Sequence, residues 1–170
     1  MVSFAIRLLF RMLVIMVTVS IAACGFQLRG TGYTVPFETL SISAPTESLI
    51  GRVLRQKIRR QGSVELVDSP QASEATIQVL KETSSRAMSV ISSSGSVDQY
   101  ELNYTARVRI VVSNQASFTK EREIQLRRIL SYSDQDLTAK SSEEEMLVED
   151  MAKEAANRVL RLLATAGLKK

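Results

Sequence analysis

Hydrophobic and polar residues alternate along several stretches of this chain, as they do in β-strands that bury one face. The clearest stretch is 100–113. One side of it carries Leu102, Tyr104, Ala106, Val108, Ile110 and Val112, and the other side carries Asn103, Thr105, Arg107, Arg109 and Ser113. Further strand candidates are residues 39–44, 74–89 and 120–133. In the last of these, Arg128 and Ile129 break the alternation, which predicts either a β-bulge or a change of environment there.

Two other stretches show the three-and-four spacing of amphipathic helices. The first lies between Thr46, the expected N-cap, and Gly62, the expected end. Its apolar side consists of Leu49, Ile50, Val53, Leu54 and Ile58, whereas Arg52, Arg55, Gln56, Arg59 and Arg60 lie largely elsewhere. Because the basic residues concentrate in the second half, where the helix dipole favours cations, we interpret them first as helix-stabilising.

The second helix is expected to begin at Ser141, because Ser141 and Glu144 have the spacing of a capping box. Its apolar stripe consists of Val148, Met151, Ala155, Val159 and Leu162. This stripe needs a surface to cover, and the apolar face of the sheet is the one available.

The order of strand, helix, three strands and helix predicts an α+β fold. We expect a two-layer sandwich, with two helices packed on one face of a mainly antiparallel sheet of about four strands. The other face of the sheet is expected to stay exposed. The short apolar run 64–66 either extends the exit from the first helix or pairs weakly with the sheet.

The start of the chain has the layout of a secretory signal peptide. Arg7 and Arg11 precede an apolar run, and small residues then lead to Cys24. The uninterrupted run after Arg11 is shorter than the roughly 20 residues that a membrane-spanning helix needs. We therefore expect residues 1–23 to be cleaved, 24–37 to form a tether and 38–168 to form one domain.

The residues around the cleavage site resemble the lipobox of bacterial lipoproteins. Ile21, Ala22 and Ala23 stand directly before Cys24, the one cysteine of the chain. The resemblance implies cleavage between Ala23 and Cys24, a diacylglycerol on the thiol, and an acyl chain such as palmitate on the new amino group. Gly25 in place of an aspartate favours the outer membrane over the inner one, with the domain on the periplasmic side. The alternative is a free thiol.

The composition excludes several classes of protein. The chain has 170 residues and no histidine. Without histidine it cannot build Ser/His or Cys/His nucleophile pairs or His-rich zinc sites, so we expect no enzyme, no metal and no cofactor. The formal net charge of +4 falls to about +2 without residues 1–23, which is too little for a nucleic-acid-binding protein.

The polar side of the predicted sheet offers a candidate site. Arg107 and Arg109 share one side of their strand, and Arg127 or Arg128 comes from the next strand. Such a patch would grip phosphates or the acidic wall of a partner. The alternative is a solvated surface on which Glu101 and Glu123 balance these charges.

The run Cys24-Gly25-Phe26-Gln27-Leu28-Arg29-Gly30-Thr31 resembles the mature start of the lipopolysaccharide-assembly lipoprotein (LptE) family. The order of the later elements agrees with that family along nearly the whole chain. The resemblance implies an outer-membrane lipoprotein that sits one-to-one inside the lumen of a large LptD-like β-barrel, the lipopolysaccharide translocon. It would plug and help assemble the barrel, and it would bind lipopolysaccharide.

In the LptE family, lipopolysaccharide contacts are placed at a basic position before the last helix and in a loop before the strand that Tyr100 marks here. Lys140 matches the first position. Residues 92–96 offer no basic residue for the second, so Arg86, or Arg107 with Arg109, is our hypothesis for a substitute. The competing functions are a free-standing, lipid-anchored periplasmic module for an acidic or hydrophobic ligand and, ranked last, a lipid-anchored hydrolase.

Overall fold

The computed structural model describes residues 7, 11–12, 35–91, 97–113, 119–131 and 137–166. The chain divides into two compact units, Met1–Gly32 and Tyr33–Lys170. The predicted cleavage site, Cys24 and most of the predicted tether lie outside the described residues. Among the helices in the described ranges, none is both long and apolar enough to cross a membrane.

The second unit is built around a five-stranded sheet. Its elements in chain order are β1 (Thr39–Ser43), α2 (Leu49–Gln61), β2 (Glu65–Leu66), the 3₁₀ turn η1 (Pro70–Ala72), β3 (Ala75–Ile91), β4 (Val97–Val112), β5 (Thr119–Ser131) and α3 (Leu137–Ala166). The strand order is β2-β1-β3-β4-β5. β1 runs parallel to β2 and β3, whereas β3, β4 and β5 are antiparallel. The predicted α+β fold is confirmed, and the strand beyond the expected four is the two-residue β2.

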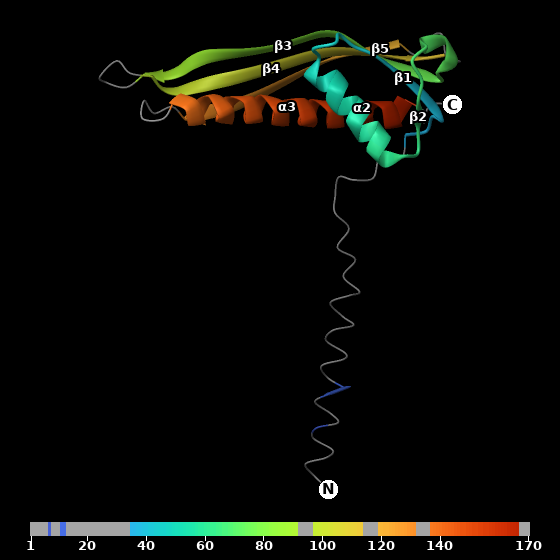
Figure 1. Cartoon of the computed structure of the whole chain (residues 1–170), viewed down its shortest axis with the longest axis horizontal. Coiled ribbons are helices and arrows are strands. Elements are labelled where there is room, and N and C mark those ends of the chain that lie inside the picture. Colours follow the sequence, from blue (N-terminus) through green and yellow to red (C-terminus); the bar gives the residue numbers. More distant parts are fainter. Residues whose placement is uncertain are drawn as a thin grey trace. The chain divides into compact units, whose positions relative to one another are not determined.

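Both helices cover the same face of the sheet, as predicted (Figure 1). α3 runs along β4 and β5, and α2 crosses it and also contacts β1. The side chains predicted to face inward from β4 are buried, namely Leu102, Tyr104, Ala106, Val108, Ile110 and Val112. Val35 is buried in the same core, and Phe37 packs against it.

The first helix keeps its predicted apolar side but begins differently. Ile50, Val53, Leu54 and Ile58 are buried, and Leu49 is partly buried. The N-cap is Ser48 and not Thr46, because the Ser48 hydroxyl accepts a hydrogen bond of 3.0 Å from the Gly51 amide. Gly62 ends the helix as predicted, with φ of 67° and its amide donating to the Ile58 carbonyl.

Glu82 of β3 supports this helix start from the sheet. Its carboxylate accepts hydrogen bonds from the Ser48 hydroxyl at 2.6 Å and from the Ile50 amide at 3.1 Å. It also accepts one from the hydroxyl of Tyr104. The negative carboxylate therefore lies at the positive end of the α2 dipole, which stabilises both.

The last helix begins earlier than the sequence pattern indicates. α3 starts at Leu137, so the predicted start at Ser141 is wrong. Glu144, which was expected to complete the capping box, binds Arg86 of β3. The predicted apolar stripe is confirmed, with Met151, Ala155 and Val159 buried and Val148 and Leu162 partly buried.

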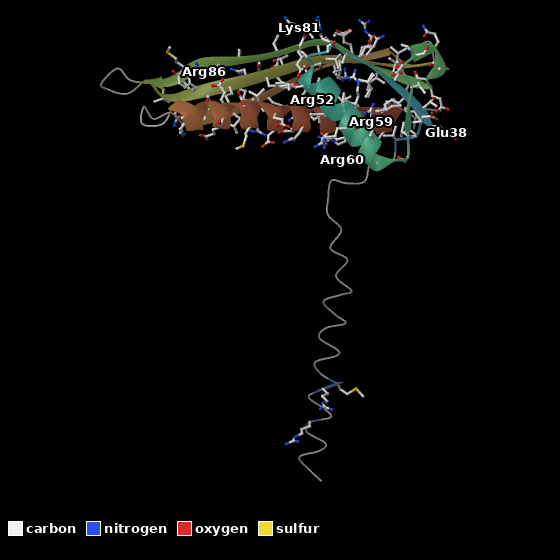
Figure 2. The ribbon with its side chains drawn as sticks, in the orientation of Figure 1. Glu38, Arg52, Arg59, Arg60, Lys81 and Arg86 are labelled. Atoms are coloured by element: carbon white, nitrogen blue, oxygen red, sulfur yellow. The ribbon has the colours of Figure 1, made fainter. Side chains whose placement is uncertain are left out.

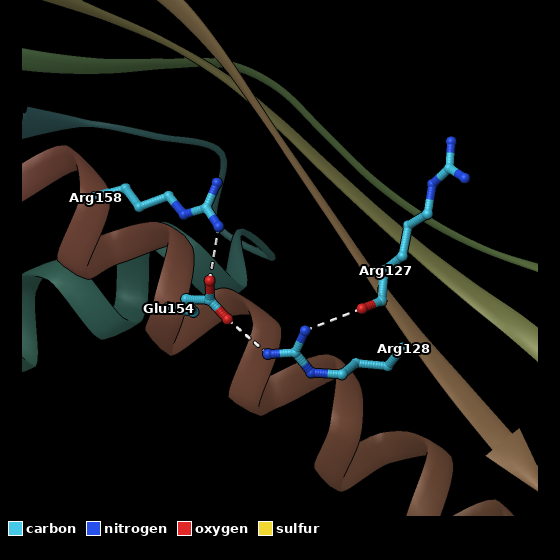
Figure 3. A network of polar contacts seen from close by, with 4 residues as sticks. All are labelled: Arg127, Arg128, Glu154 and Arg158. Atoms are coloured by element: carbon cyan, nitrogen blue, oxygen red, sulfur yellow. Dashed lines mark hydrogen bonds and ion pairs between the residues drawn. The ribbon is translucent and has the colours of Figure 1, made fainter.

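β5 continues past Arg128 and Ile129 without a register shift, so the alternative of a bulge there is wrong. The alternative of a changed environment is confirmed. Figure 3 shows Arg127 and Arg128 leaving the strand in opposite directions, with Arg128 toward α3. There Arg128 contacts Glu154 at 2.6 Å, and Glu154 also contacts Arg158 at 2.7 Å. Ile129 consequently lies on the face of the sheet that the helices do not cover, where it is 52% exposed.

Candidate functional site

One face of the sheet carries the side chains that alternate with the core residues, and we call it the open face. Its residues on the three long strands include Lys81, Thr83, Ser85, Asn103, Thr105, Arg107, Arg109, Glu121, Glu123, Gln125 and Arg127. The helices lie on the opposite face (Figure 1). The open face is therefore polar, with acidic and basic residues interspersed.

Arg107 and Arg109 share the open face, as predicted, but both are paired within the sheet. The two guanidinium groups contact the same carboxylate of Glu121, at 3.6 Å and 3.0 Å. Glu121 thus takes the role that the sequence suggested for Glu123. The other suggested partner is confirmed, since Glu101 contacts Arg127 at 3.8 Å.

The predicted patch of Arg107 and Arg109 with either Arg127 or Arg128 does not form. Arg128 points to the helix face, away from Arg127 (Figure 3). Arg127 lies opposite Asn103, four positions along β4 from Arg107, which corresponds to about 13 Å. Because Arg107 and Arg109 contact Glu121 and Arg127 contacts Glu101, these arginines are separated and each has a carboxylate partner.

Arg86 lies on the helix face, toward the hairpin end of β3, because it pairs across the ladder with buried Leu102. Its guanidinium contacts Glu144 of α3 at 2.8 Å. It also lies over the ring of Tyr100, 4.7 Å from the ring centroid, which is within the range of a cation–π interaction. Arg86 therefore ties the outer part of the hairpin to the start of α3.

Lys140 lies in the first part of α3, where its ammonium group contacts Glu143 at 2.8 Å. Lys140 and Glu144 are four positions apart on the helix, so their side chains are neighbours on its surface. Because Glu144 is the partner of Arg86, the structure brings Lys140 and Arg86 to the same region. Arg107 and Arg109 lie on the other face of the sheet, so the predicted ligand residues divide between two surfaces.

The basic residues on the exposed side of α2, interpreted from the sequence first as helix-stabilising, form a basic surface that the sequence did not predict. Arg52, Arg55 and Arg59 follow one another at spacings of three and four, and we call these three the α2 ridge. Together with Thr46, Gln56 and Arg60 they line a hollow of about 730 Å³. The available signal was that the helix sequence contains five basic residues and no acidic one.

A second hollow lies between α2 and α3. It measures about 570 Å³ and is lined by Leu49, Arg52, Ser84, Ser141, Glu144, Glu145, Val148 and Glu149. Three glutamates border it, so it does not suit an anionic ligand.

The network of Arg128, Glu154 and Arg158 joins β5 to α3 through charges. Arg158, and after it Arg128, lowers the pKa of Glu154 below its usual value, while burial acts in the opposite direction. The described residues contain no group of His, Cys, Asp or Glu that would hold a metal ion.

Comparison with known proteins decides the family. The sequence model of the LptE family, described as lipopolysaccharide-assembly, matches residues 35–163. The chain belongs to the LptE family. This confirms the resemblance recognised in the sequence, and it makes the chain an outer-membrane lipoprotein with a part in lipopolysaccharide assembly.

Solved structures agree with this family. The chain is similar to lipoprotein B from Nitrosomonas europaea, with 36% identity, a TM-score of 0.70, and coverage of 85% of this chain and 96% of that one. It is also similar in fold to rare lipoprotein B from Shewanella oneidensis, with 24% identity, a TM-score of 0.67, and coverage of 76% and 96%. A minor lipoprotein from Acinetobacter baumannii has the same fold, with 16% identity, a TM-score of 0.60, and coverage of 78% and 94%. No curated protein sequence matches significantly.

Proposed function

We propose that this LptE-family lipoprotein occupies the lumen of a large outer-membrane β-barrel, the lipopolysaccharide translocon, and helps to assemble it. The observation that carries this proposal is the family match over residues 35–163. Cys24 holds the protein in the membrane through its acyl chains, after cleavage at Ala23. The partner is one LptD-like barrel per lipoprotein.

The open face gives physical support for a lumen position. The inner wall of a large barrel is polar, and wide barrels are commonly filled by a folded plug. A plug needs a broad polar surface without excess charge of one sign. The open face meets this description, since Glu101, Glu121 and Glu123 are interspersed with Arg107, Arg109 and Arg127.

Lipopolysaccharide binding is the second part of the proposal, and we place it at Arg86 and Lys140. Both cations lie where β3 and α3 meet, and each has a single carboxylate partner that is itself partly solvent-exposed. An incoming phosphate can compete for these cations, because exposed ion pairs contribute only about 0–1 kcal/mol. Arg107 and Arg109, which share the carboxylate of Glu121 on the other face, are the alternative location.

Co-purification tests the barrel assignment. The tagged lipoprotein is extracted gently from outer membranes, and the proteins that accompany it in equal amount are identified. We expect one large β-barrel at a one-to-one ratio. Recovery of the lipoprotein alone would contradict the proposal and favour a free-standing periplasmic module.

Charge removal tests the ligand assignment. The Arg86→Gln/Lys140→Gln variant should bind lipopolysaccharide about tenfold more weakly, because each lost charge-assisted contact removes on the order of 1 kcal/mol or more. Arg107→Gln/Arg109→Gln removes the same charge from the open face. Equal losses in both variants would contradict a defined site at Arg86 and Lys140.

A further inference from the structure

Three arginines of α2, the α2 ridge, lie close together without a carboxylate partner among the residues that the structure describes. Ion pairs with carboxylates are formed elsewhere in the described residues by Arg86, Arg107, Arg109, Arg127, Arg128, Lys140, Lys153 and Arg158. Within those residues Lys81, Arg122 and Arg161 form no such pair either, so what distinguishes the α2 ridge is that three such arginines follow one another at spacings of three and four. Within the described part of the chain, no carboxylate forms an ion pair with Arg52, Arg55 or Arg59. Figure 2 shows Arg52, Arg59 and Arg60 along this helix.

Helix stability does not account for this arrangement. Like charges three and four positions apart on a helix repel one another, and the α2 ridge has them at both spacings. The helix dipole favours Arg59, which is in the last turn, but it disfavours Arg52, only four positions after the N-cap. The folded domain thus maintains a repulsive cluster that an external anion would relieve.

The geometry of the α2 ridge indicates the kind of anion. From Arg52 to Arg59 the ridge spans about 10 Å along the helix axis, since each residue rises about 1.5 Å. The Arg55 guanidinium is held in place by a hydrogen bond of 3.3 Å to the Ile42 carbonyl of β1. The hollow of about 730 Å³ is within the size range of small-ligand sites, and its lining includes four guanidinium groups.

We propose that the α2 ridge binds the phosphate groups of a phosphorylated lipid headgroup. Guanidinium groups hold phosphates through paired hydrogen bonds, so three of them in a row suit a ligand with more than one phosphate. The choice of a lipid as the source of the phosphates rests on the proposed function, whereas the site itself does not. It is separate from Arg86 and Lys140, which belong to β3 and α3.

Titration of the complete acylated lipoprotein in detergent micelles tests this site. The probes are inorganic pyrophosphate, micellar lipid A with two phosphates, and the same lipid A after removal of its phosphates. We expect the first two to bind and to compete with each other, and the third to bind at least about tenfold more weakly. Pyrophosphate binding without competition from lipid A would overturn the lipid source.

Matched variants distinguish the α2 ridge from net charge. Both are made in an Arg86→Gln/Lys140→Gln background, which removes the other proposed phosphate contact. There Arg52→Gln/Arg59→Gln should weaken binding of pyrophosphate and of phosphorylated lipid A about tenfold. Arg122→Gln/Arg161→Gln removes the same charge from exposed positions of β5 and α3 and should change binding less than about twofold. Equal effects of the two variants, or no effect of the first, would overturn the site.

Two controls separate the possible failures. Arg52→Gln/Arg59→Gln should fold with an unchanged or higher melting temperature, because it removes like-charge repulsion. If that variant loses the co-purifying barrel but keeps its phosphate affinity, the ridge contacts a protein wall and the phosphate proposal is overturned. Failure of wild type to recover a barrel would instead overturn the proposed function, whatever the phosphate titration shows.

Discussion

The hydroxyl of Tyr104 in β4 donates a hydrogen bond to Glu82 in β3, and Glu82 in turn contacts the start of α2. Tyr104 is 1% exposed, and the Glu82 carboxylate also accepts from the Ser48 hydroxyl and the Ile50 amide. One carboxylate therefore satisfies a buried phenol, a cap residue and a helix amide at once.

Glu82→Ala should lower the free energy of unfolding by about 2–3 kcal/mol, because it leaves the Tyr104 hydroxyl and the Ile50 amide without their acceptor. Denaturant unfolding followed by circular dichroism measures this change. Glu123→Ala, which removes an exposed carboxylate from the open face, is the control and should change stability by less than about 0.5 kcal/mol. Similar losses in the two variants would show that Glu82 has no special role.

The same pair predicts a stability change in alkali. Burial, and after it the hydrogen bond to Glu82 and the charge of Glu82, raises the pKa of Tyr104 above its ordinary value of 10.0. The folded state holds this proton more tightly than the unfolded state does. The contribution of the Tyr104 hydroxyl to the free energy of unfolding is therefore complete below pH 10 and is lost as the pH rises further. Wild type should lose about 1.4 kcal/mol per pH unit above pH 10 relative to Tyr104→Phe. Parallel stability curves for the two proteins between pH 9 and 11.5 would contradict this account.

Gly51 allows α2 to pack closely on the segment after β1. A Cβ at this position would lie 2.6 Å from the Cβ of Ala44 and 3.0 Å from the Ser48 oxygen. Gly51→Ala should therefore destabilise the domain by about 1–3 kcal/mol, although alanine is the better helix former. Thermal unfolding of the Ala44→Gly/Gly51→Ala double variant should show partial recovery, because it removes the closest contact. Purely additive losses would mean that the overlap with Ala44 is not the cause.

The contact between Arg128 and Glu154 predicts that the domain loses stability in acid. The pKa of Glu154 is lowered from its ordinary value of 4.5. The contribution of Glu154 to the free energy of unfolding is therefore complete above pH 4.5 and is lost as the pH falls below that value. Arg128→Ala should lower stability at neutral pH by about 0.5–1 kcal/mol and should flatten the acid dependence. Arg127→Ala, one position away on the open face, should do neither. Acid titrations of stability for the two variants make this comparison.

Elements whose pattern is complete within a short segment could be predicted from the sequence. The inward side of β4, the apolar side of α2 and its end at Gly62 are examples, because burial and φ are determined by neighbouring residues. The N-cap could not be predicted in the same way. Ser48 replaces Thr46 in that role, and Ser48 is held by Glu82, 34 positions away.

The candidate site shows the same division. The sequence places Arg107 and Arg109 on one face but does not show that they share Glu121 across the β4–β5 ladder. Arg128 is in phase with the buried residues of β5 and so lies on the helix face, but its partner Glu154 is 26 positions later, and the sequence does not show that contact. Whether a basic residue is neutralised is decided by tertiary pairing, and only the structure shows that the α2 ridge lacks such partners.

In-cell photo-crosslinking from the open face tests the central claim, the lumen position, most directly. A photoreactive residue at Thr105 or Gln125, which pair across β4 and β5, reports what covers the middle of that face. The proposal predicts a single high-mass adduct with an outer-membrane β-barrel from both positions. Acylated, outer-membrane-localised protein that gives no barrel adduct from either position would contradict it.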